Sequence, residues 1–539
     1  MNMTNYEETK RAFALDVPVG FNFTRDVVDA WAKREPSKVA LVRVDTNGEN
    51  REELTFTDIS RLANRVGNAF QALGVQPGDR AFIMSHRIPQ WWGLLCGMFK
   101  IGLVPMPATT LCTARDIEYR VNKADASALI VDVDGLAKAE EVRDKLPSVK
   151  HWICINSSEP GWTALDDLLG RASDAEPAPR ETKSSDPLLL YFTSGTVAYP
   201  KMVQHTHASY GFGHEITGRF WQDLVPTDSQ FTISDTGWAK AAWGSLFPQW
   251  RLGASVFIWD QRGKMDPTLC LRVLEESGAT VFCAPPTLYR AFAQLPLHEA
   301  NLSSVRHSIG AGEPLNPEII KIWKDATGTI IHDGYGQTET TNLVANYPCM
   351  EVRPGSMGRP CPGVEVDIVD DGGDRCGVGE EGVISVQISP QRPVNLMTGY
   401  WRDDDATAKA MRNGWYYTGD RATRDEDGYI WFVGRDDDVI TSSAYRIGPF
   451  EIESVLVEHP AVAESAVVGK ADPERTQIVK AYVVLAAGYA GSEALVSELQ
   501  DHVKKVTAPY KYPREIEFVA ELPKTISGKI RRADLRRKS

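Results

Sequence analysis

The sequence predicts an α/β fold: a large N-terminal domain of layered α/β subdomains that includes a β-rich subdomain, followed by a small C-terminal α+β domain. Short β-rich runs alternate with helical stretches through the first half of the chain, which favours largely parallel sheets whose ligands bind beyond the strand ends. The length of 539 residues exceeds the usual size of a single hydrophobic core, so we expect at least two domains.

The first clear helix is predicted over residues 57–73. Thr57 can cap its start and Gly74 its end. Its apolar residues recur at spacings of three and four, as on one face of a helix: Ile59, Leu62, Val66, Phe70 and Leu73. The predicted strands are short apolar runs at residues 81–84, 128–131, 152–155, 188–192, 255–258 and 281–283.

Changes of pattern mark the expected boundaries. The polar stretch 173–186 is predicted to be an exposed linker, and the alternating apolar residues of 364–388 indicate the β-rich subdomain. A charged turn at 434–438 is followed by a separate apolar pattern. We therefore expect an N-terminal domain over residues 1–434 and a C-terminal domain over residues 435–539.

Composition limits the classes of partner and the cellular location. A formal net charge of −13 gives no general attraction to nucleic acid or to anionic membranes. The eight cysteines are scattered without metal-site spacing, which favours free thiols in a reducing compartment. The opening residues resemble neither a signal peptide nor a transit peptide, and the most apolar stretch, 91–106, is too interrupted to span a membrane. These features predict a cytoplasmic protein.

Residues 191–201 form a loop rich in hydroxyl groups that follows a predicted buried strand. Gly195 allows close approach of the backbone to an anion, and Lys201 adds a mobile positive charge. Thr193, Ser194 and Thr196 supply hydrogen-bond donors. The spacing differs from that of the common P-loop, and an ordinary turn is the alternative interpretation. A triphosphate would suit this loop.

Four further motifs follow in order: Asp333-Gly-Tyr-Gly-Gln-Thr-Glu339, Tyr417-Thr-Gly-Asp420, Gly434-Arg435 and Pro523-Lys-Thr-Ile-Ser-Gly-Lys529. Together with the loop at 191–201 they resemble the adenylate-forming superfamily of AMP-dependent ligases, which includes the acyl-CoA synthetases. The stretches around 232–243, 445–453 and 508–514 resemble the medium-chain acyl-CoA synthetase branch in particular. The resemblance covers the chain from about residue 25 to its end.

The resemblance implies a nucleotide site. Thr338 would contact phosphates, Glu339 would bind Mg²⁺, and Asp420 would accept hydrogen bonds from ribose hydroxyls. The residues expected to bind ATP and AMP are Thr193, Ser194, Gly195, Thr196, Lys201, Gly312, Glu313, Pro314, Asp333, Gly334, Tyr335, Gly336, Gln337, Thr338, Asp420, Arg435 and Lys529. Catalysis is expected from Lys529, Thr338 and Glu339, with the Lys529 ammonium stabilising the transition state of adenylation.

The same resemblance implies sites for the acid and for coenzyme A. The acyl pocket is expected to contain Trp238, Gly310 and Tyr335. The coenzyme A site is expected to contain Ala444, Tyr445, Arg446, Arg475 and Lys504. By analogy, the C-terminal domain is mobile and turns about Asp437 between the two half-reactions.

The chain departs from the family pattern at a few positions. Val197 and Ala198 replace threonine and glycine in the phosphate loop, and Ala444 replaces a glycine beside the expected pantetheine tunnel. The sequence predicts an ATP- and Mg²⁺-dependent synthetase that converts a medium-chain, branched or aromatic acid to its CoA thioester. The alternatives are an adenylating enzyme that passes acyl-AMP to another acceptor and a non-catalytic acyl or nucleotide sensor.

Overall fold

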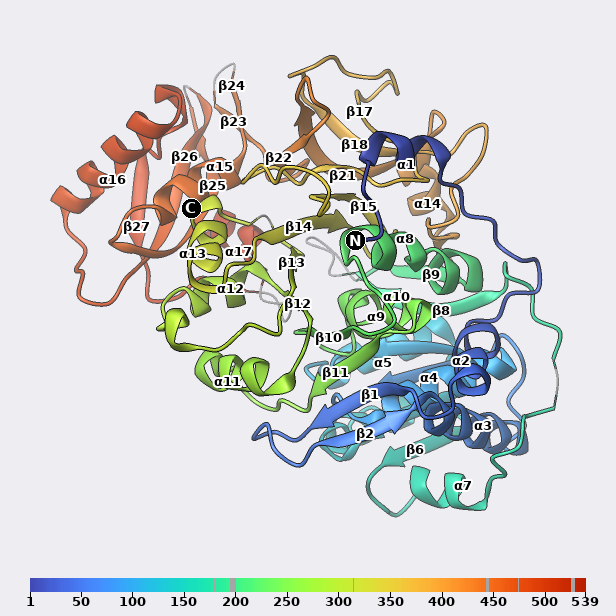
Figure 1. Ribbon diagram of the computed structural model, residues 1–539. Coiled ribbons are helices and arrows are strands. Elements are labelled where there is room, and N and C mark those ends of the chain that lie inside the picture. The colour runs from blue at the N-terminus through green and yellow to red at the C-terminus, as the bar shows by residue number, and fades with distance from the viewer. Residues whose placement is uncertain (179, 194–199, 314, 443–444, 474, 525–528) are drawn as a thin grey trace.

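The computed structural model describes residues 1–539 except 179, 194–199, 314, 443–444, 474 and 525–528. The largest sheet has the order β16-β15-β14-β13-β12-β10-β11-β1-β2, and its strands from β14 to β1 are parallel (Figure 1). Its strands are β1 Val39–Val44, β2 Glu52–Thr55, β10 Ser229–Thr232, β11 Ser255–Trp259, β12 Val281–Ala284, β13 His307–Ala311, β14 Ile331–Gly336, β15 Asn342–Ala345 and β16 Arg359–Pro360.

Both faces of this sheet are covered. Successive strand residues point to opposite sides, so each strand contributes apolar side chains to a core on either face. Phe231 and Phe282 pack under α11, α12 and α13, whereas Val256 and Ile258 join the core that contains α3, α4 and α10. The helices are α3 Phe56–Ala72, α4 Pro89–Ile101, α9 Ala239–Ser245, α10 Phe247–Leu252, α11 Pro267–Ser277, α12 Pro286–Phe292 and α13 Pro317–Thr327.

A second α/β layer is built on a parallel sheet of order β4-β3-β5-β6-β7. Helices α3 and α4 share a core with both sheets, so they link the two layers. The strands are β3 Arg80–Met84, β4 Val104–Ala108, β5 Ala128–Asp132, β6 His151–Ile155 and β7 Thr163–Ala164, and the helices that follow them are α5 Ala114–Ala124, α6 Leu136–Glu140 and α7 Leu165–Arg171. The predicted layered α/β fold is confirmed.

The predicted helix at 57–73 is present as α3, but the predicted cap was wrong. Thr55 is the N-cap and forms a capping box with Asp58, which satisfies the first free N–H groups of the helix. The Thr57 hydroxyl donates instead to the Pro36 carbonyl oxygen. The linker prediction for 173–186 was also only partly right, because Thr182 is buried there and Asn68 in α3 donates to backbone carbonyls of this stretch.

The β-rich part combines strands β8 and β9, which precede β10 along the chain, with strands that follow β16. One sheet has the order β17-β18-β21-β20 with β22 on β21, and a smaller sheet has the order β19-β9-β8. The strands are β8 Pro187–Phe192, β9 Met202–Thr206, β17 Val366–Val369, β18 Gly382–Gln387, β19 Gly399–Tyr400, β20 Met411–Arg412, β21 Trp415–Arg424 and β22 Ile430–Arg435. Remaining helices of this half are α1 Tyr6–Ala12, α2 Asp29–Arg34, α8 His214–Ile216 and α14 Asp404–Ala410.

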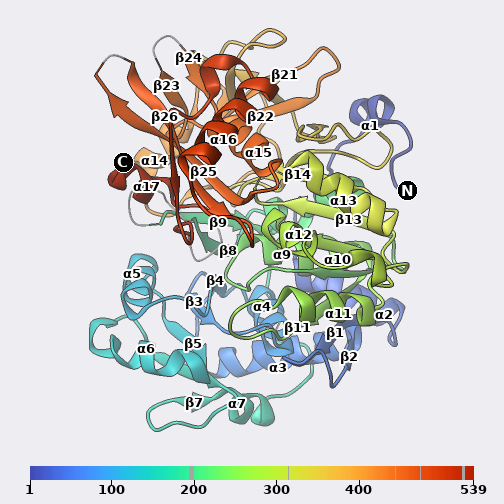
Figure 2. The same ribbon diagram turned by 90° about the vertical axis from the view of Figure 1, so that its left-hand side faces the viewer.

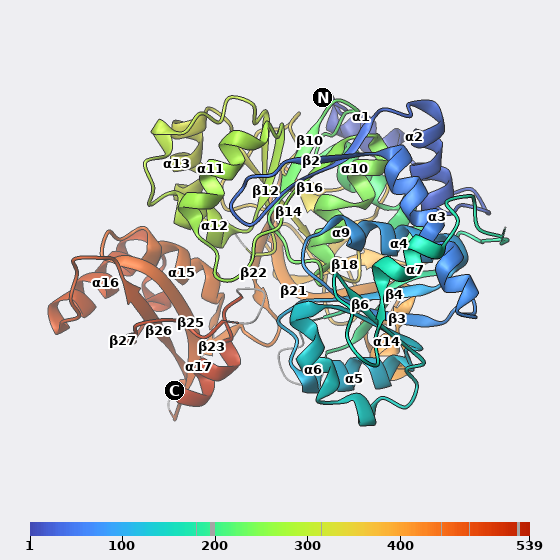
Figure 3. The same cartoon turned by 90° about the horizontal axis from the view of Figure 1, so that it is seen from below.

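The C-terminal part is α+β, as predicted, with a sheet of order β24-β23-β26-β25 and β27 on β26. Figures 2 and 3 show it to one side of the rest of the chain, next to α12 and β14. Its elements are β23 Ile440–Ser442, β24 Tyr445–Ile447, α15 Pro449–Val457, β25 Val462–Asp472, β26 Thr476–Leu485, α16 Glu493–Val506, β27 Glu515–Phe518 and α17 Arg532–Lys538. The exact boundary at residue 434 stays a prediction.

Each of the eight cysteines is a free thiol. Within the described part of the chain, every helix is too short or too polar to cross a bilayer.

Candidate active site

A cavity of about 1640 Å³ lies where the parallel strands of the largest sheet end and the C-terminal part begins. Its walls include Ile233, Pro285 and Gly312, each of which directly follows a strand, β10, β12 and β13 respectively. The expectation of a ligand site beyond the strand ends is thus met by a cavity of suitable size.

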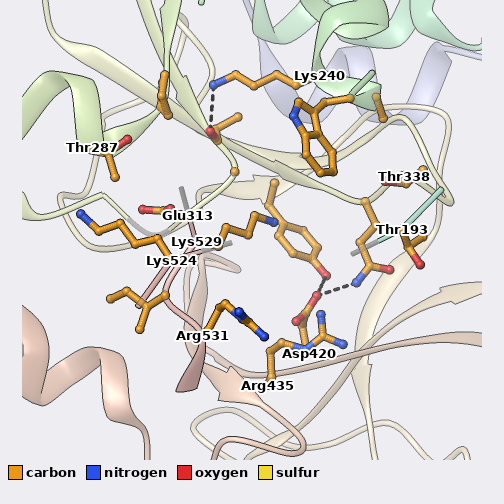
Figure 4. A pocket seen from close by; sticks show the side chains of 18 of the residues that line it. Thr193, Lys240, Thr287, Glu313, Thr338, Asp420, Arg435, Lys524, Lys529 and Arg531 are labelled. Carbon is orange, nitrogen blue, oxygen red and sulfur yellow. Dashed lines mark hydrogen bonds between the residues drawn. The ribbon is translucent and has the colours of Figure 1, made fainter. Parts of the chain in front are cut away.

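Motifs that are far apart in the sequence meet in this cavity. The predicted site residues that line it are Thr193, Lys201, Trp238, Gly312, Glu313, Asp333, Gly334, Tyr335, Gly336, Gln337, Thr338, Glu339, Asp420, Arg435, Asp437 and Lys529. Figure 4 shows Lys529 between Glu313 on one side and Asp420 and Arg435 on the other. Ser194, Gly195, Thr196, Pro314 and Ala444, together with Val197 and Ala198, lie outside the described residues.

Asp420 and Arg435 face each other across the paired strands β21 and β22. Their spacing along the chain is that of a hairpin, which turns two distant positions into neighbours. The Asp420 Oδ2 atom accepts hydrogen bonds of 2.6 Å from the Tyr335 hydroxyl and 2.6 Å from the Gln337 amide (Figure 4). Burial raises the pKa of Tyr335, so its hydroxyl stays a donor. These contacts orient the Asp420 carboxylate for further donors such as ribose hydroxyls.

Glu339 is buried, and its Oε1 atom accepts a hydrogen bond of 2.9 Å from the Tyr400 hydroxyl. Burial raises the pKa of the Glu339 carboxyl group. The Lys201 ammonium lies 4.5 Å from the centre of the Tyr400 ring. A buried carboxylate gains from a hard cation that also binds phosphate oxygens, so the residues fit a magnesium site. Sequence reasoning missed Tyr400, because it belongs to β19 and lies far along the chain from the motif at 333–339.

The Thr338 carbonyl oxygen accepts hydrogen bonds from His205, over 2.7 Å to Nε2, and from the Tyr210 hydroxyl, over 3.0 Å. Burial lowers the pKa of His205 to about 3, so the ring is neutral. Because a carbonyl oxygen only accepts, Nε2 carries the proton, and Nδ1 accepts from the Ser209 hydroxyl over 2.9 Å. The Tyr210 oxygen in turn accepts from the Trp243 indole over 3.1 Å.

Sequence reasoning missed His205 and Tyr210. The signal available to it was a pair of histidines, His205 and His207, directly after the phosphate loop. Each is buried. Buried histidines are more often structural than functional, and only the tertiary contact with Thr338 distinguishes His205.

Lys529 lines the cavity from the C-terminal part. The segment after it, α17, is fixed close to the expected hinge. Arg536 donates to the Asp437 carbonyl oxygen over 3.0 Å and to the Asp438 carboxylate over 2.7 Å. Arg532 forms an ion pair of 2.7 Å with Glu453. The helix that follows Lys529 in the chain is therefore tied to residues 437 and 438.

Trp238 and Lys240 bring the start of α9 to the cavity wall. Lys240 Nζ donates to the Ala311 carbonyl oxygen over 3.1 Å. Gly310 is not among the lining residues, and a Cβ added to it would lie 3.3 Å from Ile331 Cγ2. Its expected acyl contact therefore stays a prediction. Asp333 is buried, which raises its pKa to about 8.

Of the expected coenzyme A residues, Tyr445, Arg475 and Lys504 lie on the C-terminal part and are not among the residues that line the cavity. The Tyr445 ring is half exposed and stacks on Tyr510 with ring centres 4.0 Å apart. Lys504 forms an ion pair of 2.9 Å with Asp501. Arg475 lies beside the turn at Asp472, where its backbone N–H donates to the carboxylate over 2.8 Å. Arg446 belongs to β24. Their role in binding coenzyme A stays a prediction.

Comparison with known proteins agrees with this geometry. The family model of the AMP-binding enzymes matches residues 28–401, and that of the AMP-binding enzyme C-terminal domain matches residues 451–529. The human mitochondrial acyl-coenzyme A synthetase ACSM3 is 44% identical, over 100% of this chain and 93% of its own. That relative is named mitochondrial, so the cytoplasmic location stays a prediction.

Solved structures give the same result. The anthranilate CoA ligase AuaEII in complex with anthranoyl-AMP superposes with a TM-score of 0.90 at 31% identity, covering 97% of this chain and 98% of that one. The benzoate CoA ligase of Burkholderia xenovorans LB400 has a TM-score of 0.83 at 29% identity, covering 96% and 100%. The chain belongs to the AMP-binding enzymes, and within them to the acyl-CoA synthetases, which are AMP-forming acid–thiol ligases.

Proposed function

We propose that the protein is an ATP- and Mg²⁺-dependent synthetase that activates a medium-chain, branched or aromatic carboxylic acid through acyl-AMP and transfers the acyl group to coenzyme A. The observation that carries this proposal is the single cavity that Asp420, Glu339, Lys529 and Trp238 line together. Adenylation of an acid requires a carboxylate that binds the nucleotide, a buried acidic residue, a cation and an aromatic wall. Asp420, Glu339, Lys529 and Trp238 would supply these groups in that order.

In the first half-reaction, an oxygen of the substrate carboxylate attacks the α-phosphorus of ATP. The bond from that phosphorus to the bridging oxygen of pyrophosphate breaks, which gives acyl-AMP and pyrophosphate. Asp420 and Arg435 hold the ribose, and Thr338 with Lys201 binds phosphate oxygens. The Lys529 ammonium stabilises the charge that develops on the α-phosphate. Glu339 would hold Mg²⁺, which neutralises phosphate charge when it is bound.

In the second half-reaction, the C-terminal domain, residues 435–539, turns relative to residues 1–434 about Asp437. This rotation withdraws Lys529 and brings the coenzyme A residues, Ala444, Tyr445, Arg446, Arg475 and Lys504, to the cavity. The coenzyme A thiolate attacks the acyl carbonyl carbon, and the bond from that carbon to the AMP oxygen breaks. AMP and the thioester are released. The bonds from Arg536 to residues 437 and 438 support a hinge at this place.

The experiment is a pyrophosphate-release screen of the purified protein with Mg·ATP. Straight-chain, branched and aromatic acids of increasing length are compared, each with and without coenzyme A. Release that rises with coenzyme A for one class of acid supports the synthetase and identifies its substrate. Accumulation of acyl-AMP that is indifferent to coenzyme A would favour transfer to another acceptor, and ATP binding without any release would favour a sensor.

A further inference from the structure

Lys240 is a cavity residue for which the proposed steps have no use. It lies in the first turn of α9, two residues after Trp238, and both side chains reach the cavity wall. Its side chain is partly buried and lines the cavity. Figure 4 shows Lys240 across the drawn side chains from Asp420 and Arg435. It therefore lies away from the expected ribose site.

The Lys240 ammonium has more donors than the protein satisfies. A lysine offers three N–H donors, and among the described residues the Lys240 ammonium donates to one acceptor, the Ala311 carbonyl oxygen, at 3.1 Å. Burial lowers the pKa of Lys240, which is the response of a cation that has lost water without gaining an equivalent partner.

The neighbouring acids do not compensate this charge. Glu313 lies 3.5 Å from Arg290 and shares its charge with that guanidinium. Asp333 has a pKa raised to about 8 by burial, so it is mostly neutral at physiological pH. The Cys283 thiol is buried, which raises its pKa, and Lys529 is a further cation. The groups that face Lys240 thus leave room for an acceptor supplied by a ligand.

The position of Lys240 indicates which part of a ligand it would meet. Its bond to Ala311 places the ammonium beside the end of β13, next to Gly310, on the wall that Trp238 shares. Lys201 and Lys529 also line the cavity, and in the proposed function they supply the cations for the nucleotide. The acceptor for the Lys240 ammonium therefore belongs to the acid and not to ATP.

We propose that Lys240 selects an acid that carries a second oxygen acceptor, a ketone or a second carboxylate, away from the reacting carboxylate. This inference rests on the proposed function, because it names the substrate class of the same site. An acid with a purely hydrocarbon chain would offer this partly buried ammonium no acceptor, and burying a charged donor without a partner is costly. An acid with an oxygen at the matching distance would satisfy it.

The test compares matched acids on the wild-type protein and on Lys240→Met, which keeps the length of the side chain without its charge. Straight-chain monocarboxylates are set against keto acids and dicarboxylates of the same number of carbons, with pyrophosphate release as the readout. The wild type should prefer one oxygen-bearing acid by at least about tenfold in kcat/KM. In Lys240→Met the ratio of kcat/KM for the oxygen-bearing acid to that for the hydrocarbon acid should fall to about one, mainly through a higher KM for the oxygen-bearing acid. Comparison of the keto acids with the dicarboxylates shows whether the acceptor is a ketone or a second carboxylate.

Lys138→Met is the matched control. Lys138 in α6 also donates to a backbone carbonyl, that of Thr110, over 2.7 Å, but it does not line the cavity. The Lys138→Met variant should keep the wild-type preference for the oxygen-bearing acid. Lys240→Gln, which retains a donor, should keep part of it. Since Lys240→Met removes an incompletely solvated charge, its thermal unfolding temperature should equal or exceed that of the wild type.

The outcomes separate the two proposals. An equal loss of kcat/KM for hydrocarbon and oxygen-bearing acids in Lys240→Met would overturn the inference, because it would assign Lys240 to the reacting carboxylate. A hydrocarbon acid preferred by the wild type would also overturn it, while leaving the synthetase intact. Absence of pyrophosphate release from the wild type with every acid would instead overturn the proposed function, and the inference with it.

Discussion

The Nε2–H group of His205 donates a hydrogen bond of 2.7 Å to the carbonyl oxygen of Thr338. This contact joins β9, which follows the phosphate loop, to the motif that carries Thr338 and Glu339. Because His205 has a pKa of about 3, it remains a neutral donor throughout the physiological range. The backbone at Thr338 is therefore fixed by a contact that pH does not switch.

Replacement of His205 by alanine should displace this backbone and lower kcat/KM for Mg·ATP by about 10- to 100-fold, since small misplacements of reacting groups cost rates of that order. His205→Gln, which can donate to the same oxygen, should recover part of the loss. Pyrophosphate release at varied Mg·ATP measures both variants.

His214→Ala is the control for lost packing, because His214 is equally buried and its Nδ1 atom contacts Thr217 instead. Similar kinetic losses in His205→Ala and His214→Ala, at similar thermal unfolding temperatures, would contradict a positioning role for His205.

Lys529→Ala should reduce pyrophosphate release by at least about 100-fold while ATP binding persists, because a charge that stabilises the transition state acts on the rate more than on binding. Binding is measured by calorimetry and release by a coupled assay. Lys524→Ala is the comparison, since Lys524 lies in the same segment and pairs with Glu464 at 2.7 Å. Unchanged release in Lys529→Ala would refute its catalytic role.

Asp420→Asn should weaken ATP binding and reduce discrimination against 2′-deoxy-ATP. The carboxylate accepts from Tyr335 and Gln337, and an amide cannot accept from these donors and from two ribose hydroxyls equally well. A loss of about 1.5–3 kcal/mol, the range for a hydrogen bond to a charged group, is expected for ATP. If the ratio of ATP to 2′-deoxy-ATP affinity stays at the wild-type value, Asp420 does not bind the ribose.

The unliganded protein should lose stability as pH rises from about 4 to about 8. Burial raises the pKa of Asp333 from 3.8 to about 8, so the folded state keeps a proton that the unfolded state releases in this window. The free energy of unfolding should fall by up to about 1.4 kcal/mol per pH unit from this group. Urea unfolding of the wild type and of Asp333→Asn measures the effect, and an identical pH slope in both proteins would contradict it.

Local patterns were sufficient for much of the fold. The apolar runs at 81–84, 128–131 and 281–283 are strands β3, β5 and β12, because short β-rich stretches between helices have few alternatives in a layered protein. The cap of α3 was misplaced by two residues, from Thr55 to Thr57, since either hydroxyl fits the sequence pattern and only the backbone geometry decides.

The sequence by itself determined the family and the residues of its linear motifs, such as Asp420, Glu339 and Lys529, because their order and spacing are written along the chain. Only the tertiary structure revealed Tyr400 beside Glu339, His205 beside Thr338 and the incompletely satisfied ammonium of Lys240. These contacts join segments that are distant in the chain, and burial sets the protonation of their groups. Neither property can be obtained from local sequence alone.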